Sequence, residues 1–474
     1  MNAVNKKYIH IIIMVILMFA IGALSPVYSL TPYGMQVLGV FVGILYGWIF
    51  IDLIWPSIFG FVALGSIGTN TIVGTFCSGF GNMSLMMVLL PMLFAGALEE
   101  AGVTDFLANW FLKRKFVRRS PWFLVAGLVA LSFVLGVLQA GLAAVFVVWA
   151  LVIKVADECN IPRENHLVSF LIFMVVATAF TSALIMPFAP GSLMWGAFYP
   201  AALSVPYPSF MAYAAIVLAT VCTGVFLAGK IILRLDASSF VLSQKTIAEL
   251  DSKKSTKAQK IGFAILVVYM LALLLPGIMP TVMGMAALKK IGVVGMSALA
   301  LLVMAVLVVE GKPLISLEKT FTKHTQWTLI LLLAVTFPLG DAIKSADAGI
   351  IATSNQIFTP LVSNMGIGTF MILSMAFLGM LTQVTHNIVL GAAFIPLLCP
   401  LCESLGGNGI VMWFVLFFML QCAYITPAAS MNSALVHGHE RMIKKDAYIL
   451  GAIFFLVELI VLAILGIPLG NIMF

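Results

Sequence analysis

Four short stretches of proline, glycine and polar residues interrupt long apolar runs of this chain. Two lie in its first half, at 139–145 and 187–192, and two in its second half, at 382–388 and 426–433. An interrupted helix leaves backbone N–H and C=O groups unpaired, and its positive end suits anions whereas free carbonyl groups suit cations. We therefore expect these four loops to form one binding site. Packing kinks are the alternative, because proline and glycine also occur in ordinary membrane helices.

His386 is the most informative single residue of these loops. Placing an ionisable group at the tip of a hairpin inside a membrane costs free energy, so such a group indicates a function by default. The ordinary pKa of histidine, about 6.5, would let His386 exchange a proton near neutral pH. A neutral histidine that donates one hydrogen bond to a neighbour is the alternative.

The composition indicates the class of protein that positions these residues. The chain has 474 residues, of which 62% are hydrophobic and 9% are charged, whereas a soluble domain is roughly 45–50% apolar and about 25% charged. This excludes a soluble enzyme, a nucleic-acid-binding protein and a disordered scaffold. We predict an all-α polytopic membrane protein with about 11 transmembrane helices and two re-entrant hairpins in two inverted repeats. The expected spans are 8–28, 33–50, 53–70, 84–101, 166–187, 209–233, 261–277, 291–309, 326–343, 409–427 and 446–468.

Two further apolar segments, 121–156 and 366–402, are too long for one span. Each has polar residues or glycine at its middle. Backbone that leaves a helix at membrane depth must be buried in protein or line a cavity. We therefore expect both segments to enter the membrane and turn back as helical hairpins.

An internal repeat divides the chain. Residues 1–32 form a first span, 33–235 form repeat 1, 236–260 form a cytoplasmic linker, and 261–474 form repeat 2. Each repeat should contain three spans, a surface helix, a hairpin, a broken span (166–200 in the first, 409–437 in the second) and a last span. Five crossings per repeat give the two repeats opposite orientations, which is typical of transporters with a site near the midplane.

The charges set the expected orientation. The chain carries 25 Lys and Arg against 18 Asp and Glu, a net charge of +7. The basic residues gather in short loops beside the spans, which indicates cytoplasmic loops rather than a nucleic-acid partner. We predict a multi-pass protein of the cell membrane with a cytoplasmic N-terminus.

Two glycine patterns have plain structural interpretations. Gly39, Gly43 and Gly47 place small residues on one face of the second span, which permits close helix packing. We expect this contact within one protomer rather than between two. Residues 224–230 fit G-x-x-x-x-G-K, but Ile231 replaces the magnesium-binding Ser or Thr, so no ATP site is expected.

The second half resembles a known transporter family. Residues 381–396, LTQVTHNIVLGAAFIP, are similar to the second hairpin of the divalent anion:sodium symporter (DASS) family, which carries Ser-Asn-Thr with a proline nine residues after the Asn. Asn387 and Pro396 have that spacing. Residues 423–438, AYITPAASMNSALVHG, also align without gaps with the family's second broken span. The resemblance implies an elevator-type secondary transporter of di- or tricarboxylates that is usually a homodimer.

The chain departs from the family at both hairpin tips. The Ser-Asn-Thr triplet is His386-Asn387-Ile388 in the second hairpin and Ala-Ala-Val at 143–145 in the first. The resemblance implies that the missing side chains would bind carboxylates and sodium. Both hypotheses, sodium coupling and proton coupling through His386, therefore stay open.

The matched positions and the loops together name the candidate site. The candidate substrate-binding residues are Gln139, Gly191, Ser192, Asn387, Ser430, Asn432 and Ser433, and the candidate ion-coupling residues are Thr382, His386 and Asn387. We predict no catalytic residue, no metal site and no cofactor apart from sodium as one of the two coupling ions.

The predicted function is secondary active transport of a small organic anion, coupled to sodium or protons, across the lipid bilayer. The alternatives are a passive anion channel, or an inorganic-anion or cation/proton exchanger of the same superfamily. Rings of charge or a filter motif would favour a channel, and the sequence has neither. A membrane enzyme lacks support because no paired carboxylates, H-E-x-x-H or nucleophile motif occurs within the apolar runs.

Overall fold

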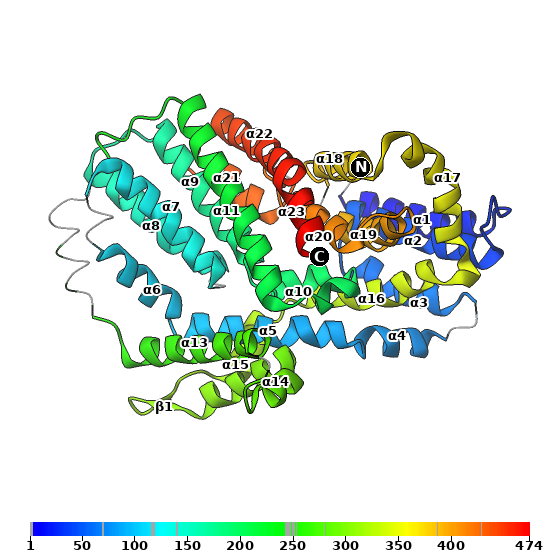
Figure 1. Ribbon diagram of the computed structural model, residues 1–474, viewed down its shortest axis with the longest axis horizontal. Coiled ribbons are helices and arrows are strands. Elements are labelled where there is room, and N and C mark those ends of the chain that lie inside the picture. The colour runs from blue at the N-terminus through cyan, green and yellow to red at the C-terminus, as the bar shows by residue number, and fades with distance from the viewer. Residues whose placement is uncertain are drawn as a thin grey trace.

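The chain folds almost entirely into helices (Figure 1). The computed structural model describes residues 3–68, 71–114, 119–138, 141–241, 254–279, 281–385, 387–427 and 429–474, together with residues 248 and 252. Within these ranges, β structure is confined to the short pairing of β1 (Val308–Val309) with β2 (Lys312–Pro313). Nine helical stretches of the described residues are long and apolar enough to cross a membrane. The predicted all-α polytopic membrane fold is confirmed.

The first half begins with helices that form one side of the molecule and ends with the first hairpin and broken span. Its elements are α1 (Ala3–Gly22), α2 (Pro32–Phe50), α3 (Trp55–Gly65), α4 (Ile72–Phe80), α5 (Met83–Glu100), α6 (Val103–Leu112), α7 (Pro121–Val137), α8 (Gly141–Glu158), α9 (His166–Ser182), η2 (Ala183–Ile185), α10 (Pro190–Ala197), η3 (Pro200–Ser204) and α11 (Tyr207–Ile232).

The second half is also mostly helical. It contains α13 (Lys257–Ile278), α14 (Met285–Val306), β1 and β2, α15 (Leu317–His324), α16 (Trp327–Lys344), η4 (Ala346–Ala348), α17 (Ile350–Met365), α18 (Ile367–Leu381), α19 (Asn387–Ser404), α20 (Gly409–Leu420), α21 (Met431–Gly438), α22 (Lys444–Val461), the π-helical η5 (Leu462–Gly466) and α23 (Ile467–Met473).

One expected span is two short helices instead. The segment 53–70 contains α3, which ends at Gly65, and the chain then turns at Gly68, where φ is 64°. Thr71 starts α4, because its side chain accepts a hydrogen bond from the backbone N–H of Gly74 at 3.0 Å. Helix α3 therefore ends before the predicted end of this span, and Thr71 begins a separate helix beyond it.

Both broken spans begin with the same cap. The Asn165 side chain accepts hydrogen bonds from the first backbone N–H groups of α9, and Asn408 does so for α20. An asparagine at this position satisfies donors that have no partner inside the helix. The matching caps support the predicted correspondence between the two halves.

Each hairpin packs against the first piece of its own broken span. The arms α7 and α8 both contact α9, and α18 and α19 both contact α20. Figure 1 shows α9 running beside α11 and α22, and the contacts of α22 with α9 and α11 join the two halves. The second helix of each broken span contacts the first helix of the other broken span. Helix α21 contacts α9. Helix α10 contacts α20 through Trp195, whose carbonyl oxygen accepts a hydrogen bond from Trp413 Nε1 at 2.9 Å.

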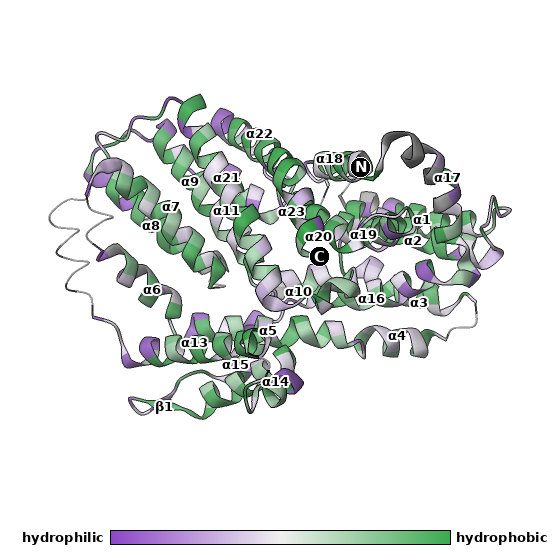
Figure 2. Ribbon diagram, in the orientation of Figure 1, coloured by the Kyte–Doolittle hydropathy of each residue, from purple (hydrophilic) through white to green (hydrophobic). Residues whose placement is uncertain are grey.

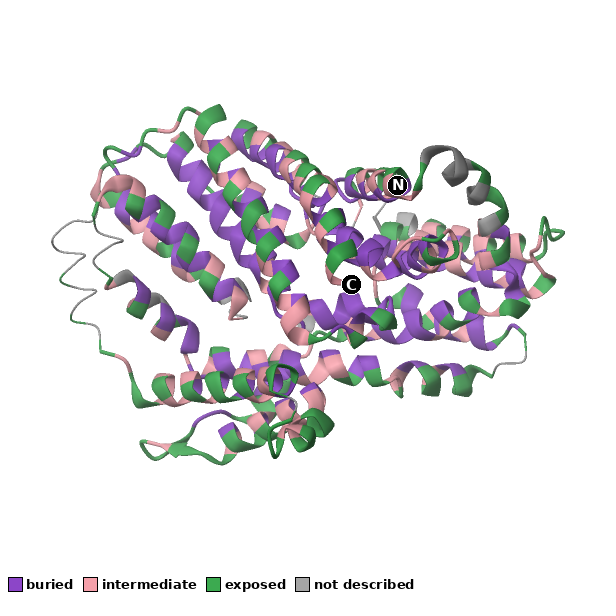
Figure 3. Cartoon of the chain, in the orientation of Figure 1, coloured by how far each residue is buried: buried purple, intermediate pink, exposed green. Residues whose placement is uncertain are grey.

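The broken spans form the centre and other helices form the rim. Over an apolar 18-residue stretch of α9 and η2, 89% of the residues are buried, whereas the figure for such a stretch is 28% in both α13 and α14. Figure 3 shows the same contrast between α9 and α13, and Figure 2 shows that exposed parts of α13 and α14 are also hydrophobic. Apolar side chains on an outer face suit lipid contact.

The glycine face of α2 packs within the protomer, as predicted. A Cβ atom on Gly39 would lie 2.2 Å from the Met18 carbonyl oxygen, and one on Gly43 would lie 2.1 Å from Met18 Cγ. A Cβ on Gly47 would meet Met14 and Pro56. These three glycines therefore let α1 approach α2 closely.

Candidate functional site

The tip of the second hairpin is hydrogen-bonded to the irregular segment that interrupts the second broken span. Gln383 Nε2 donates to the carbonyl oxygens of Gly379 at 2.8 Å and Cys422 at 3.1 Å, and Gln383 Oε1 accepts from the Ile425 N–H at 3.0 Å. The Thr426 hydroxyl donates back to the Gln383 carbonyl oxygen. This buried glutamine therefore satisfies backbone groups that the interrupted helix leaves unpaired.

Asn387 and Thr382 lie on either side of Gln383 and make further hydrogen bonds to the second broken span. Asn387 Nδ2 donates to Gln421 Oε1 at 2.6 Å, and its own Oδ1 accepts from the Ile388 N–H at 2.9 Å. Asn387 is 8% exposed, and Thr382 is fully buried with its hydroxyl donating to the Leu420 carbonyl oxygen at 3.3 Å. Two side-chain amides thus face each other across the tip and the break.

The N-terminus of α21 closes the other end of the break. Ser430 caps it, accepting from the Ser433 N–H at 3.0 Å and donating to the Ala423 carbonyl oxygen at 2.8 Å. The Ser433 hydroxyl donates to the Thr426 carbonyl oxygen at 2.6 Å, and the Asn432 side chain hydrogen-bonds the Tyr424 hydroxyl. A helix N-terminus surrounded by amides and hydroxyls presents several donors to an anion.

The corresponding region of the first half is apolar. Ser192 is 1% exposed, and its hydroxyl donates to the Leu184 carbonyl oxygen at 3.3 Å within its own break. A Cβ atom on Gly191 would meet no atom within 4 Å. Gly136, just before the first tip, approaches α9 closely, because a Cβ there would lie 2.1 Å from the Ala179 carbonyl oxygen.

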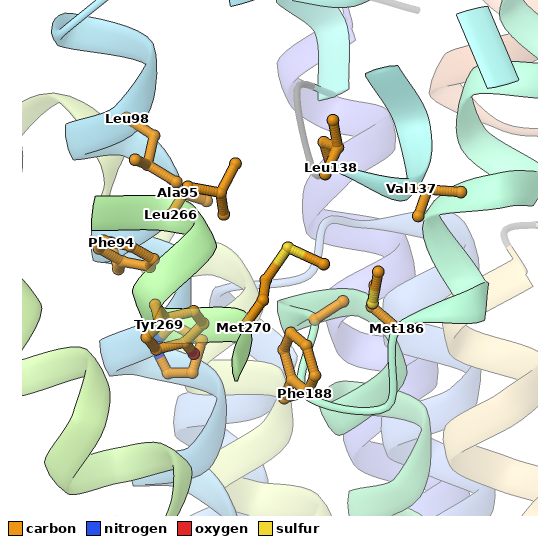
Figure 4. Close-up of a pocket in the computed structure, with 12 residues that line it drawn as sticks. Phe94, Ala95, Leu98, Val137, Leu138, Met186, Phe188, Leu266, Tyr269 and Met270 are labelled. Carbon is orange, nitrogen blue, oxygen red and sulfur yellow. The ribbon is translucent and has the colours of Figure 1, made fainter. Parts of the chain in front are cut away.

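A small cavity separates the first hairpin and first break from α5 and α13 (Figure 4). Val137 and Leu138 line it from the hairpin, Phe188 lines it from the break, and Tyr269 and Met270 line it from α13. Its volume of 20 Å³ leaves room for about one water molecule. No passage for an organic anion is open here.

Trp195 connects the first break to the second hairpin. A Cβ atom on Gly391, one turn after Asn387, would lie 2.1 Å from the Trp195 ring. The indole N–H of Trp195 is buried and has no hydrogen-bond partner among the described residues. A buried donor without a partner costs free energy, so this N–H is available to a bound acceptor.

The structure thus separates the sequence-predicted residues into groups. It gathers Thr382, Asn387, Ser430, Asn432 and Ser433 around the break of 421–430. Gly191 and Ser192 lie in the first turn of α10, just after the other break. Gln139 and His386 lie outside the described residues.

Four polar residues of this region were not among the predicted site residues. Gln383 and Gln421 hold the tip against the break, Tyr424 contacts α21 from within the break, and Glu458 is buried in α22 beside it. Glu458 could have been recognised from the sequence, because an acidic residue in the middle of the apolar span 446–468 indicates a function. The role of Gln383 depends on partners distant in the chain.

Comparisons with known proteins support a transporter. No protein-family model matches the chain. An uncharacterized transporter of Haemophilus influenzae is 24% identical over 187 residues, and the match spans 40% of this chain and only 40% of that relative. The crystal structure of the YdaH transporter of Alcanivorax borkumensis has the same fold, with a TM-score of 0.57 over 98% of both chains at 16% identity. The chain is therefore similar in sequence to part of a protein named as a transporter, and in fold to the YdaH transporter.

Proposed function

We propose that the protein is a secondary active transporter of a small organic anion of the di- or tricarboxylate class. The observation that carries this proposal is the cluster of amides and hydroxyls around the N-terminus of α21, next to the tip of the second hairpin. Carboxylates need several hydrogen-bond donors when they leave water. The donors would come from Asn387 at the hairpin tip, from Asn432, and from the backbone N–H groups at the start of α21.

Binding would exchange partners rather than fill vacant donors. Asn387 Nδ2 donates to Gln421 in the present arrangement, so a carboxylate oxygen would replace the Gln421 amide oxygen. Such an exchange keeps the Asn387 amide hydrogen-bonded, and a charged acceptor makes the stronger hydrogen bond. The unpartnered N–H of Trp195, which packs against Gly391, would add a donor from the first half.

Alternating access of the elevator type fits the packing. The two broken spans lie at the buried centre, each hairpin packs on its own broken span, and less buried helices lie around them. The cavity between the first hairpin and α13 holds about one water. A carrier that moves its site past the surrounding helices needs no open pore, whereas a passive channel does.

The coupling ion in this proposal is sodium or a proton. Free carbonyl groups of the second break could help to hold sodium, but Ala144 and Val145 of the first hairpin are buried apolar residues. A hard cation needs several oxygen ligands, and the described side chains of the first hairpin tip add none. A proton requires only one acceptor.

Uptake into proteoliposomes tests the proposal. Purified protein should accumulate radiolabelled succinate, malate or citrate above the outside concentration when a sodium or proton gradient is imposed. Uptake should saturate, and protein-free vesicles should show none. If the substrate only reaches equal concentrations inside and outside, and if uptake does not depend on either gradient, the result would contradict a coupled carrier and favour the channel.

A further inference from the structure

Glu458 is a buried carboxyl group that nothing above employs. It lies on α22, is 1% exposed, and its Oε2 atom has no hydrogen-bond partner among the described residues. The next residues along the helix form the π-helical turn η5, and the Leu462 N–H bonds back to the Glu458 carbonyl oxygen. Such π turns occur frequently at functional sites.

The neighbours of Glu458 belong to the candidate site. Cys422 and Tyr424 of the second break and Cys222 of α11 interact electrostatically with its carboxyl group. Tyr424 hydrogen-bonds Asn432, and the Cys422 carbonyl accepts from Gln383. The carboxyl group therefore lies close to the break of 421–430.

No described basic residue forms an ion pair with Glu458. On the elements that pack against α22, α18 and α20 have no titratable residue. His166 of α9 pairs instead with Asp446 at 2.7 Å. His437 of α21 packs on Tyr448, and its Nε2 lies 3.3 Å from the Tyr424 carbonyl oxygen.

The remaining titratable groups of α11 also have other partners. Lys230 lies over the Trp122 ring at 3.9 Å, and the Tyr213 hydroxyl donates to the Gly466 carbonyl oxygen at 2.9 Å. The Tyr207 ring, at the start of α11, packs against Phe188 with ring centroids 5.7 Å apart. Lys444 and Lys445 belong to the first turn of α22, roughly three and a half to four turns from Glu458 at 3.6 residues per turn.

An isolated carboxylate in such surroundings is costly, whereas the neutral acid is tolerated. We propose that Glu458 is the proton-binding group of the transporter, and that it gains and releases one proton as the break of 421–430 changes partners. The carboxylate and one proton from water form the neutral acid, and the reverse step returns the proton to water on the other side.

This site would explain how proton and substrate are linked. A di- or tricarboxylate brings negative charge to the loop, and protonation of Glu458 offsets one unit of it nearby. Movement of Tyr424 with Asn432 would change the polarity around the carboxyl group. The coupling role rests on the proposed transport function, but proton binding by Glu458 can be measured without any substrate.

Infrared difference spectroscopy on the full-length protein in lipid vesicles is the test. Steps of pH should produce a titrating C=O band of a protonated carboxylic acid in wild type, and Glu458→Gln should abolish it. Glu100→Gln is the matched control, because the Glu100 side chain is also buried at 8% exposed but lies beside His324 on α15. That control should keep the band.

Each outcome decides the proposal. A band that depends on Glu458 but never titrates would overturn it by showing a permanently neutral structural acid, and the absence of any such band would overturn it too. If Glu458→Gln does not fold, ¹³C-labelled glutamate in wild type and in Glu100→Gln identifies the band by its isotope shift. Failed uptake with an intact titrating band would contradict the transport function and not the proton site.

Discussion

Single side chains of the second break take over hydrogen bonds that a continuous helix would have made. The hydroxyls of Thr382, Ser430 and Ser433 donate to backbone carbonyls between 420 and 426. Each such bond contributes about 0.5–1.5 kcal/mol net, and an unpaired buried group would cost more. Irregular backbone can persist at this depth because these residues satisfy it.

Replacing Asn387 or Asn432 with Ala should abolish uptake in proteoliposomes. Each change removes an amide donor that we assign to the substrate, whereas the helices around it stay packed. Expression and elution volume in size-exclusion chromatography should match wild type. Asn471→Ala, at an exposed position of α23, is the control and should transport normally. Unchanged kinetics in both test variants would move the binding site elsewhere.

Asp52 provides a pH-dependent contact between α1 and the loop after α2. Partial burial would raise the pKa of Asp52, but the hydrogen bonds from Lys7 Nζ at 2.9 Å and from the Trp55 and Ile54 N–H groups together lower it below the usual value. A lowered pKa stabilises the fold above the ordinary pKa of about 3.9, and this contribution is lost as pH falls through the folded-state value.

Asp52→Asn should therefore lower the melting temperature slightly at neutral pH and not in acid. The effect should stay below about 1 kcal/mol, because both side chains are more than a third exposed. Thermal unfolding of both proteins at about pH 7 and about pH 3 measures it. A difference that grows in acid would have the wrong sign for this contact.

At the scale of elements, close helix contacts depend on small residues. Gly43 faces Met18 of α1, Gly136 faces Ala179 of α9, and Gly391 faces Trp195 of α10. Lipid and side chains are equally apolar, so packing and hydrogen bonds rather than the hydrophobic effect hold such helices together.

Gly43→Leu should separate α1 from α2 and destabilise the protein by about 1–3 kcal/mol, the usual cost of overpacking. The added side chain would overlap Met18, whose Cγ lies 2.1 Å from the new Cβ position. The same change at Gly368 of α18, where no atom lies within 4 Å of a Cβ, should cost much less. Thermal unfolding in detergent compares the two, and equal losses would contradict the packing argument.

The hairpins should place their two ends on one side of the membrane. In a background without the native cysteines, Arg119→Cys and Lys154→Cys should react with an impermeant thiol reagent from the cytoplasmic side. Gly366→Cys and Glu403→Cys should react from the outside. Reaction of Arg119→Cys and Lys154→Cys from opposite sides would mean that α7 and α8 together cross the bilayer.

The whole molecule is held together by contacts between its halves. Trp413 bonds the Trp195 carbonyl, Tyr213 bonds the Gly466 carbonyl, and Arg441 of the second half pairs with Asp157 of the first hairpin. Ser169 of α9 also accepts from the Ile443 N–H at 2.9 Å. The halves are therefore interlocked rather than simply linked.

Two separate chains, 1–240 and 254–474, should assemble when they are expressed together. The contacts between halves lie outside the omitted segment, so a tag on one chain should recover the other in equal amount. Trp413→Ala in the second chain should reduce recovery. Purification of the first chain alone in a folded form would show that the halves are independent.

The sequence by itself determined the helical membrane class, because this feature depends on local properties. Long apolar runs with few charged residues are enough to indicate helices that cross a membrane. The re-entrant hairpins, the broken spans and the inverted repeats stay predictions.

Only the tertiary structure decided which polar residues come together in one site. Gln383 bonds Cys422 and Ile425, Asn387 bonds Gln421, and Glu458 lies close to the break of 421–430, although these residues are far apart in the chain. Helix periodicity says which face a residue occupies but not which distant helix meets that face. That choice depends on the packing of the whole molecule, where close contacts such as Gly391 with Trp195 select one arrangement of the helices.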